Sequence, residues 1–214
     1  MKVAIFDSGV SAEIPVEMCR DFTNDKNCKD YSGHGTFISS IFLSKDLACP
    51  GIVPDAEVYM FKVFNAEQES MTAWFLEAFN YAMHLGIDII NLSTGGIDFT
   101  DIPFTEKVKE LVDYGIVVVS AIGNDGPGHG TLSNPGDQPE TIGVGGLDSV
   151  NEEVAAYSSA GPSLWENSGR IKPDILTYSS NIFGFSKGSC RTSSGTSIAS
   201  PILTASLTLI MSSL

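Results

Sequence analysis

Residues 2–10 read KVAIFDSGV and contain the first apolar run of the chain. The run from Val3 to Phe6 is apolar at consecutive positions instead of every second one, which is typical of a strand buried on both faces. Such strands occur in parallel sheets that helices cover on both sides. Asp7 ends the run, so the sequence predicts a carboxylate at the C-terminal end of a central strand.

Similar runs recur along the chain and alternate with segments of helical period. We expect further strands at residues 57–64, 87–93, 115–124, 141–146 and 172–179, and helices at residues 34–44, 72–85, 103–114 and 196–213. Because this alternation indicates βαβ units, it predicts an α/β fold: a three-layer α/β/α sandwich with a mostly parallel central sheet. No linker or repeat divides the chain, so residues 1–214 are predicted to form one domain.

The composition of the chain narrows the classes of function that we expect for the protein. The chain has 214 residues, of which 43% are hydrophobic and 18% charged, as in globular proteins. Its formal net charge of -14 repels phosphate groups and anionic lipid, so we expect no nucleic acid partner and no membrane contact by this domain. The charge favours basic ligands, such as arginine-bearing peptides or metal cations.

Both ends of the sequence are apolar, which suggests a domain trimmed from a longer protein. No run of about 20 apolar residues and no signal-peptide pattern is present. Targeting signals, a propeptide or a membrane anchor are expected outside this piece if they exist.

The four cysteines, Cys19, Cys28, Cys49 and Cys190, lack the CxxC spacing of zinc or redox motifs. An even number in loop-like sequence favours disulfides, with free buried thiols as the alternative. Cys19 and Cys28 flank a polar loop and would close it locally, which would leave Cys49 to pair with Cys190.

Three polar residues offer the groups that nucleophilic hydrolysis requires. Asp7 ends a strand in IFDSGV, His34 opens a helix in SGHGTFIS, and Ser197 opens another in SGTSIASP. A serine hydroxyl needs an imidazole to accept its proton and a carboxylate to orient that imidazole. The order Asp, His, Ser is the order found in subtilisin, and Ser197 lacks the GxSxG motif of α/β-hydrolases.

The strings DSG, GHGT and GTSIASP resemble the three signature blocks of the subtilase family, and the resemblance extends over the whole chain. It implies a subtilisin-like fold and a catalytic triad of Asp7, His34 and Ser197. The string SAIGNDG is similar to the family segment that supplies the oxyanion donor, which gives that role to Asn124. The backbone amide of Ser197 would be the second donor.

Runs away from the triad, such as WFLEAFNYA and HGTLSNPGDQ, look most similar to the site-1 protease branch of that family. The resemblance implies a protein or peptide substrate that pairs with residues 92–96 as an extended strand. The pocket for the residue before the scissile bond would be lined by three short segments: Ser93, Thr94 and Gly95; Ala121, Ile122 and Gly123; and Leu132, Ser133 and Asn134.

The branch resemblance also implies a non-basic residue before the scissile bond and an arginine four residues upstream of it. A carboxylate is therefore expected near the upstream pocket, with Asp98 and Asp101 as first candidates, Glu69 and Glu77 as weaker ones, and Phe75 as a wall. The alternative for Asp98 and Asp101 is a solvated loop that caps the following helix. Trp74 and Trp165 are interpreted as packing residues.

No cofactor is expected for catalysis. The segment SKDLACPGIVP looks shorter than the calcium loop of bacterial subtilisins, which puts a structural calcium ion there in doubt. By family topology Cys49 would come near Cys190, so a disulfide would take the place of the metal. The resemblance and the cysteines together imply the secretory pathway (Golgi or ER lumen) or the extracellular space.

The sequence therefore predicts a serine endopeptidase of the processing type. A second hypothesis is a catalytically silent binding module derived from a protease. A third is that the trimmed piece is inert although its parent protein is active.

Overall fold

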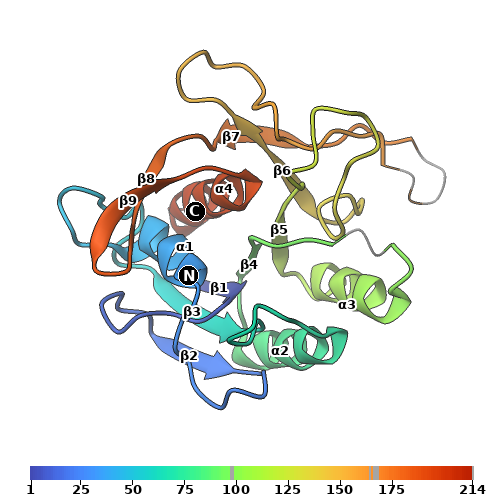
Figure 1. Cartoon of the computed structure of the whole chain (residues 1–214). Helices are drawn as coiled ribbons and strands as arrows, with labels where there is room; N and C mark the ends of the chain where they lie inside the picture. The colour runs from blue at the N-terminus through green and yellow to red at the C-terminus, as the bar shows by residue number, and fades with distance from the viewer. Residues whose placement is uncertain (97–98, 164, 166–168, 214) are drawn as a thin grey trace.

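The computed structural model of the protein describes residues 1–96, 99–163, 165 and 169–213 (Figure 1). Its centre is a seven-stranded sheet in the order β2-β3-β1-β4-β5-β6-β7, and every neighbouring pair in it is parallel. The strands are β1 (Lys2–Asp7), β2 (Met18–Asp21), β3 (Glu57–Lys62), β4 (Ile89–Leu92), β5 (Val117–Ala121), β6 (Ile142–Leu147) and β7 (Ile175–Tyr178).

Two helices lie on each face of this sheet (Figure 1). α1 (His34–Leu43) and α4 (Thr196–Ser212) pack on one face, and α2 (Thr72–Leu85) and α3 (Ile102–Asp113) on the other. Each face of the sheet has its own hydrophobic core, and β1 contributes residues to both. Val3 and Ile5 pack with α1 and α4, whereas Ala4 and Phe6 pack with α2 and α3. This confirms the predicted three-layer α/β/α fold and explains why the strand is apolar throughout.

The order of the strands places a topological switch point between β1 and β4. The chain continues from β1 to β2 and β3 on one side, and from β4 to β7 on the other. In open α/β sheets, ligands bind at such a point, beyond the carboxyl ends of the strands. Asp7 ends β1 and Ser93 follows β4, so both lie at this edge.

The predicted helices agree with the observed ones to within a residue at each end, but β2 and a hairpin near the C-terminus were missed. β2 is short and largely polar, and β8 (Ile182–Ser186) and β9 (Ser189–Ser193) form an antiparallel hairpin outside the main sheet. The turn between β8 and β9 has positive φ at Lys187 and Gly188, the geometry that two-residue hairpins prefer. Gly188 was therefore a usable signal for this hairpin.

None of the described helices combines the length and the apolar character that a membrane-spanning segment requires.

Candidate active site

Asp7 and His34 form the first pair of the site. Asp7 is 2% exposed at the end of β1, and its carboxylate oxygens lie 2.8 Å and 3.0 Å from His34 Nδ1. The negative charge of Asp7 raises the pKa of His34, although burial acts in the opposite direction. When Nδ1 carries the proton and donates a hydrogen bond to Asp7, Nε2 is left to accept a proton from another group.

Asp30 fixes the start of α1 and is a residue that the sequence analysis missed. Its Oδ1 accepts hydrogen bonds from the Gly33 amide and the Ser8 hydroxyl, at 2.8 Å and 2.9 Å. Its Oδ2 accepts from the Thr36 amide and hydroxyl, at 2.8 Å and 2.6 Å. Burial raises the pKa of Asp30, but these hydrogen bonds outweigh burial and leave the pKa lowered. The position of Asp30, four residues before His34, was the available signal.

A buried lysine supports the same region from the neighbouring strand. Lys62 ends β3 with its side chain fully buried, and its ammonium donates to the carbonyl oxygens of Ser8 and Lys29 at 3.0 Å and 2.8 Å. Asp25 Oδ2 lies 3.2 Å from the ammonium and balances its charge. The turn after Asp7 is thus tied to the loop that carries Asp30.

The side chains of Ser197 and Asn124 both lie close to Gly195, the residue before the start of α4. Gly195 has φ 143°, and a Cβ atom there would lie 3.2 Å from Ser197 Oγ and 3.6 Å from Asn124 Nδ2. The serine hydroxyl and the amide group therefore lie beside the same glycine. The Ser197 backbone amide belongs to the first turn of α4, where helix amides lack an intrahelical acceptor.

Thr196 orients the Asn124 side chain. Its backbone amide lies 2.8 Å from Asn124 Oδ1, and its hydroxyl lies 3.0 Å from the same oxygen. Because the carbonyl end of Asn124 is held in this way, the Nδ2 end remains as a donor at an exposed position. Sequence reasoning passed over Thr196, which stands next to the proposed nucleophile.

The predicted segments of the substrate groove meet at Ser133. A Cβ atom on Gly123 would lie 2.5 Å from Ser133 Oγ, and one on Gly95 would lie 2.8 Å from Ser133 Cβ. Gly96 and Asn134 form an antiparallel bridge, with N–H···O distances of 3.0 Å and 2.8 Å. Ser93 and Thr94 follow β4 at the same edge, and Ala121 and Ile122 are buried beneath it at the end of β5.

A small cavity of about 140 Å³ connects His34 with the ends of β1 and β4. Besides Asp7, His34, Ser93 and Thr94, it is lined by Ser8, Phe64 and Gln68. Phe64 and Gln68 were not among the predicted site residues. They follow β3, whose carboxyl end lies at the same edge of the sheet as that of β1.

A larger cavity of about 220 Å³, named the upstream cavity here after the pocket predicted at Asp101 and Phe75, lies between the segment after β4 and helices α2 and α3. Asp101 and Phe75 line it, together with Phe64 and Phe104. Asp101 also caps α3, because its carboxylate accepts hydrogen bonds from the Phe104 amide at 3.1 Å and from the Thr72 hydroxyl. Asp101 thus caps the helix and also lines the cavity, whereas its role toward an arginine stays a prediction.

Three other acidic residues, Asp98, Glu69 and Glu77, were predicted as candidates for the upstream pocket. Asp98 lies outside the described residues. Glu69 and Glu77 are exposed and are not among the residues that line the upstream cavity, and Glu77 approaches Arg20 instead, at 4.0 Å.

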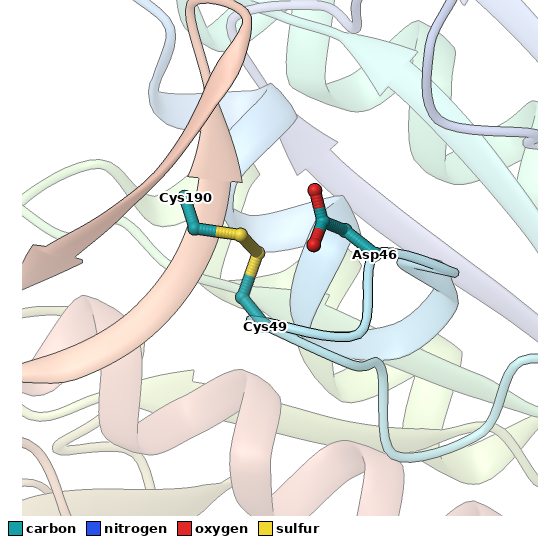
Figure 2. A group of neighbouring side chains, drawn as sticks. All are labelled: Asp46, Cys49 and Cys190. Atoms are coloured by element: carbon teal, nitrogen blue, oxygen red, sulfur yellow. A yellow bond between two sulfur atoms is a disulfide. The ribbon is translucent and has the colours of Figure 1, made fainter.

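All four cysteines form disulfides, which excludes the free-thiol alternative. Cys19 pairs with Cys28 and Cys49 with Cys190. Among the described residues, Asp46, Cys49 and Cys190 form a group spaced for a metal ion, but its two sulfur atoms are bonded to each other (Figure 2). A disulfide sulfur is not a thiolate, so this group lacks the ligands that a metal ion would need. The doubt that the sequence raises about a structural calcium ion stays a prediction.

Comparisons with known proteins agree with this geometry. Residues 1–214 match the model of the subtilase family. The chain is 47% identical to the membrane-bound transcription factor site-1 protease of Rattus norvegicus, over 99% of this chain and 21% of that protein. It is 31% identical to the major intracellular serine protease of Bacillus subtilis, over 99% of this chain and 68% of that protein.

Among solved structures, a psychrophilic protease is similar with a TM-score of 0.86 and 27% identity, over 99% of this chain and 77% of that chain. The chain spans about a fifth of the length of the site-1 proteases that it matches.

Proposed function

The chain belongs to the subtilase family and is a subtilisin-like serine protease, and from this premise we propose that Asp7, His34 and Ser197 are its catalytic triad. The carboxylate of Asp7 at 2.8 Å from His34 Nδ1 is the main support for this proposal. The shared position of Ser197 Oγ and Asn124 Nδ2 beside Gly195 is the second.

In the proposed reaction, His34 Nε2 takes the proton of Ser197 Oγ as this oxygen attacks the peptide carbonyl carbon. Asp7 accepts the hydrogen bond from Nδ1 and stabilises the imidazolium. Asn124 Nδ2 and the Ser197 amide donate to the oxyanion of the tetrahedral intermediate. His34 then protonates the leaving amine, and water hydrolyses the acyl-enzyme with His34 again as the base.

We propose that the substrate lies as an extended strand against Ser93, Thr94 and Gly95, by addition to the exposed edge of that segment. Ser133, Gly95 and Gly123 would wall the pocket for the residue before the scissile bond. These walls carry no acidic side chain, which favours a non-basic residue there.

An arginine upstream of the scissile bond is proposed to enter the cavity of about 220 Å³ beside Asp101. The three phenylalanine rings of the cavity, from Phe64, Phe75 and Phe104, suit the apolar stem and the flat guanidinium group. Asp101 supplies the negative charge, and its bonds to the Phe104 amide and the Thr72 hydroxyl hold it in place.

The cellular role is proposed by analogy with the relatives that the chain resembles. A processing endopeptidase of the secretory pathway is consistent with two disulfides, because such bonds persist in oxidising compartments. The longer relatives include the membrane-bound transcription factor site-1 protease of Rattus norvegicus. A membrane anchor and a propeptide in the full-length protein accordingly remain predictions.

A fluorophosphonate probe tests the mechanism, because it reacts with activated serines. We expect labelling of Ser197 in the purified protein, prepared in a version extended to its natural ends, and its loss in Ser197→Ala and His34→Ala. Ser194→Ala, which changes a serine three residues away, should keep the label. A folded protein that resists the probe would contradict the triad and support the silent binding module instead.

Peptide cleavage then tests the specificity. We expect peptides with arginine four residues before the scissile bond to be cleaved faster than those with citrulline, which has the same shape without the charge. Asp101→Asn should remove this preference while fluorophosphonate labelling persists. Equal cleavage of both peptides by the unmodified protein would refute the role of Asp101.

A further inference from the structure

A third cavity, of about 350 Å³, lies behind the wall of the substrate groove. Its volume is within the range of small-ligand sites. It is lined by Phe99, Gly130, Leu132, Asp137, Pro162, Ser163 and Trp165, which include no member of the proposed triad. Leu132, which was predicted to line the pocket before the scissile bond, lines this cavity, and its neighbour Ser133 lies against Gly95 and Gly123.

Asp137 places a buried carboxylate in this cavity. The residue is 3% exposed, and its Oδ2 accepts a hydrogen bond from Trp165 Nε1. Its Oδ1 is buried and has no hydrogen-bond partner among the described residues. A buried acceptor without a donor is unfavourable, so this oxygen is suited to a ligand that brings one.

No basic side chain of the described residues forms an ion pair with the Asp137 carboxylate. Lys172 is the basic residue whose charge acts on it, but the Lys172 ammonium donates to the Thr141 carbonyl oxygen at 2.8 Å and to Asp174. Burial raises the pKa of Asp137 and outweighs the lowering effects of the Trp165 hydrogen bond and the Lys172 charge.

The rest of the lining is mainly apolar. Phe99 and Trp165 contribute aromatic rings, and Leu132 and Pro162 contribute aliphatic surface. Aromatic rings beside a carboxylate attract organic cations. A calcium ion would need six or more oxygen ligands, whereas Asp137 offers one free carboxylate oxygen.

We propose that this cavity is a second binding site, which takes the guanidinium group of an arginine side chain. The guanidinium N–H groups donate to Asp137 Oδ1, and the plane of the group lies against the aromatic rings. The site differs from the proposed arginine pocket at Asp101, which has another set of lining residues. Leu132, which lines the cavity, directly precedes Ser133, which lies against Gly95 and Gly123, so an occupied cavity would restrain this wall of the proposed substrate groove.

Calorimetric titration with Nα-acetyl-arginine amide tests this proposal in the Ser197→Ala protein, in which catalysis does not interfere. We expect binding that weakens roughly tenfold or more with the citrulline analogue and in an added Asp137→Asn substitution. The introduced carboxamide would keep a carbonyl oxygen for Trp165 and present its N–H groups to the cavity. Asp101→Asn is the matched control and should leave this binding in place.

A second variant guards against misfolding of Asp137→Asn. Phe99 is 43% exposed, so Phe99→Ala should fold normally and weaken arginine binding severalfold through the lost ring contact. Equal binding with and without the Asp137 substitution, loss of binding only in Asp101→Asn, or no binding at all would overturn the proposal. Occupation of Asp137 Oδ1 by water alone in a crystal soaked with the arginine amide would also overturn it.

Discussion

Two carboxylates, those of Asp7 and Asp30, act on His34 in different ways. Asp7 contacts the imidazole directly, whereas Asp30 holds the backbone amides of Gly33 and Thr36 on either side of it. The charge of Asp30 also contributes to the raised pKa of His34, after that of Asp7. Asp30 is therefore a positioning residue with an electrostatic effect that can be measured.

The raised pKa of His34 predicts the pH dependence of activity. The proposed base works as the neutral imidazole, so kcat/KM should fall as the pH drops through a pKa above the ordinary 6.5. Asp30→Asn should shift this acidic limb to lower pH and reduce kcat about tenfold. A pH–rate profile checks both expectations.

Asp21→Asn is the control for that substitution. Asp21 accepts hydrogen bonds from Thr23 and Asn27 within its own loop, and none of these bonds reaches α1. An acidic limb that moves equally in both variants, or in neither, would contradict the role given to Asp30.

At the level of elements, one residue, Asp101, both caps helix α3 and lines a cavity. The Asp101 cap satisfies the Phe104 amide, and the same carboxylate lines the upstream cavity. Asp101→Ala should lower the free energy of unfolding by about 1 kcal/mol, whereas Asp101→Asn should cost much less because asparagine also caps helices.

Chemical denaturation of the two variants measures this difference. If both lose the same stability, the cap does not hold α3 in the way described. If Asp101→Asn keeps both stability and the preference for arginine, charge is not what the cavity recognises.

The hairpin of β8 and β9 is fixed to α1 by contacts and to the loop after α1 by a disulfide. Gly184 lies against the ring of Phe37, where a Cβ atom would come within 2.8 Å of it, and Ser186 donates to the Gly33 carbonyl oxygen. The Cys49–Cys190 bond joins residues 141 positions apart, whereas the Cys19–Cys28 bond joins residues 9 positions apart.

Loop length predicts different effects for the two disulfides. In the chain-entropy model, loss of the long-range bond costs about 5 kcal/mol and loss of the local bond about 2.7 kcal/mol. Unfolding of Cys49→Ala/Cys190→Ala and of Cys19→Ala/Cys28→Ala, compared under the same conditions, checks this order. A larger loss from the local bond would show that Cys19–Cys28 acts through the native loop that carries Asp30.

At the scale of the whole molecule, the net charge of -14 attracts basic substrates over distances longer than a contact. We expect kcat/KM for the arginine peptide to fall severalfold as ionic strength rises from about 0.01 to 0.15 M, because salt shortens the Debye length. The matched citrulline peptide should change little. An equal salt response for both would indicate an effect on the enzyme itself instead of on attraction of the substrate.

The sequence by itself determined the class of fold, since the apolar runs around Val3 to Phe6 and their successors alternate with segments of helical period, which is typical of a parallel sheet covered on both faces. It also indicated Asp7, His34, Ser197 and Asn124, because each stands in a short local motif. The sequence did not decide between disulfides and free thiols, or between a helix cap and a pocket residue at Asp101. Both questions depend on which residues lie close together in the folded protein.

Only the tertiary structure revealed Asp30, Lys62 and the cavity around Asp137. Asp30 accepts hydrogen bonds from Gly33 and Thr36, three and six positions away, but its partner Ser8 follows β1 and is distant in sequence. Lys62 is buried by the packing of β3 against β1, which its own neighbours in sequence do not disclose. Asp137 meets Trp165 through folding of distant loops, so the burial and the missing partner of its carboxylate arise from the assembled fold and not from any local pattern.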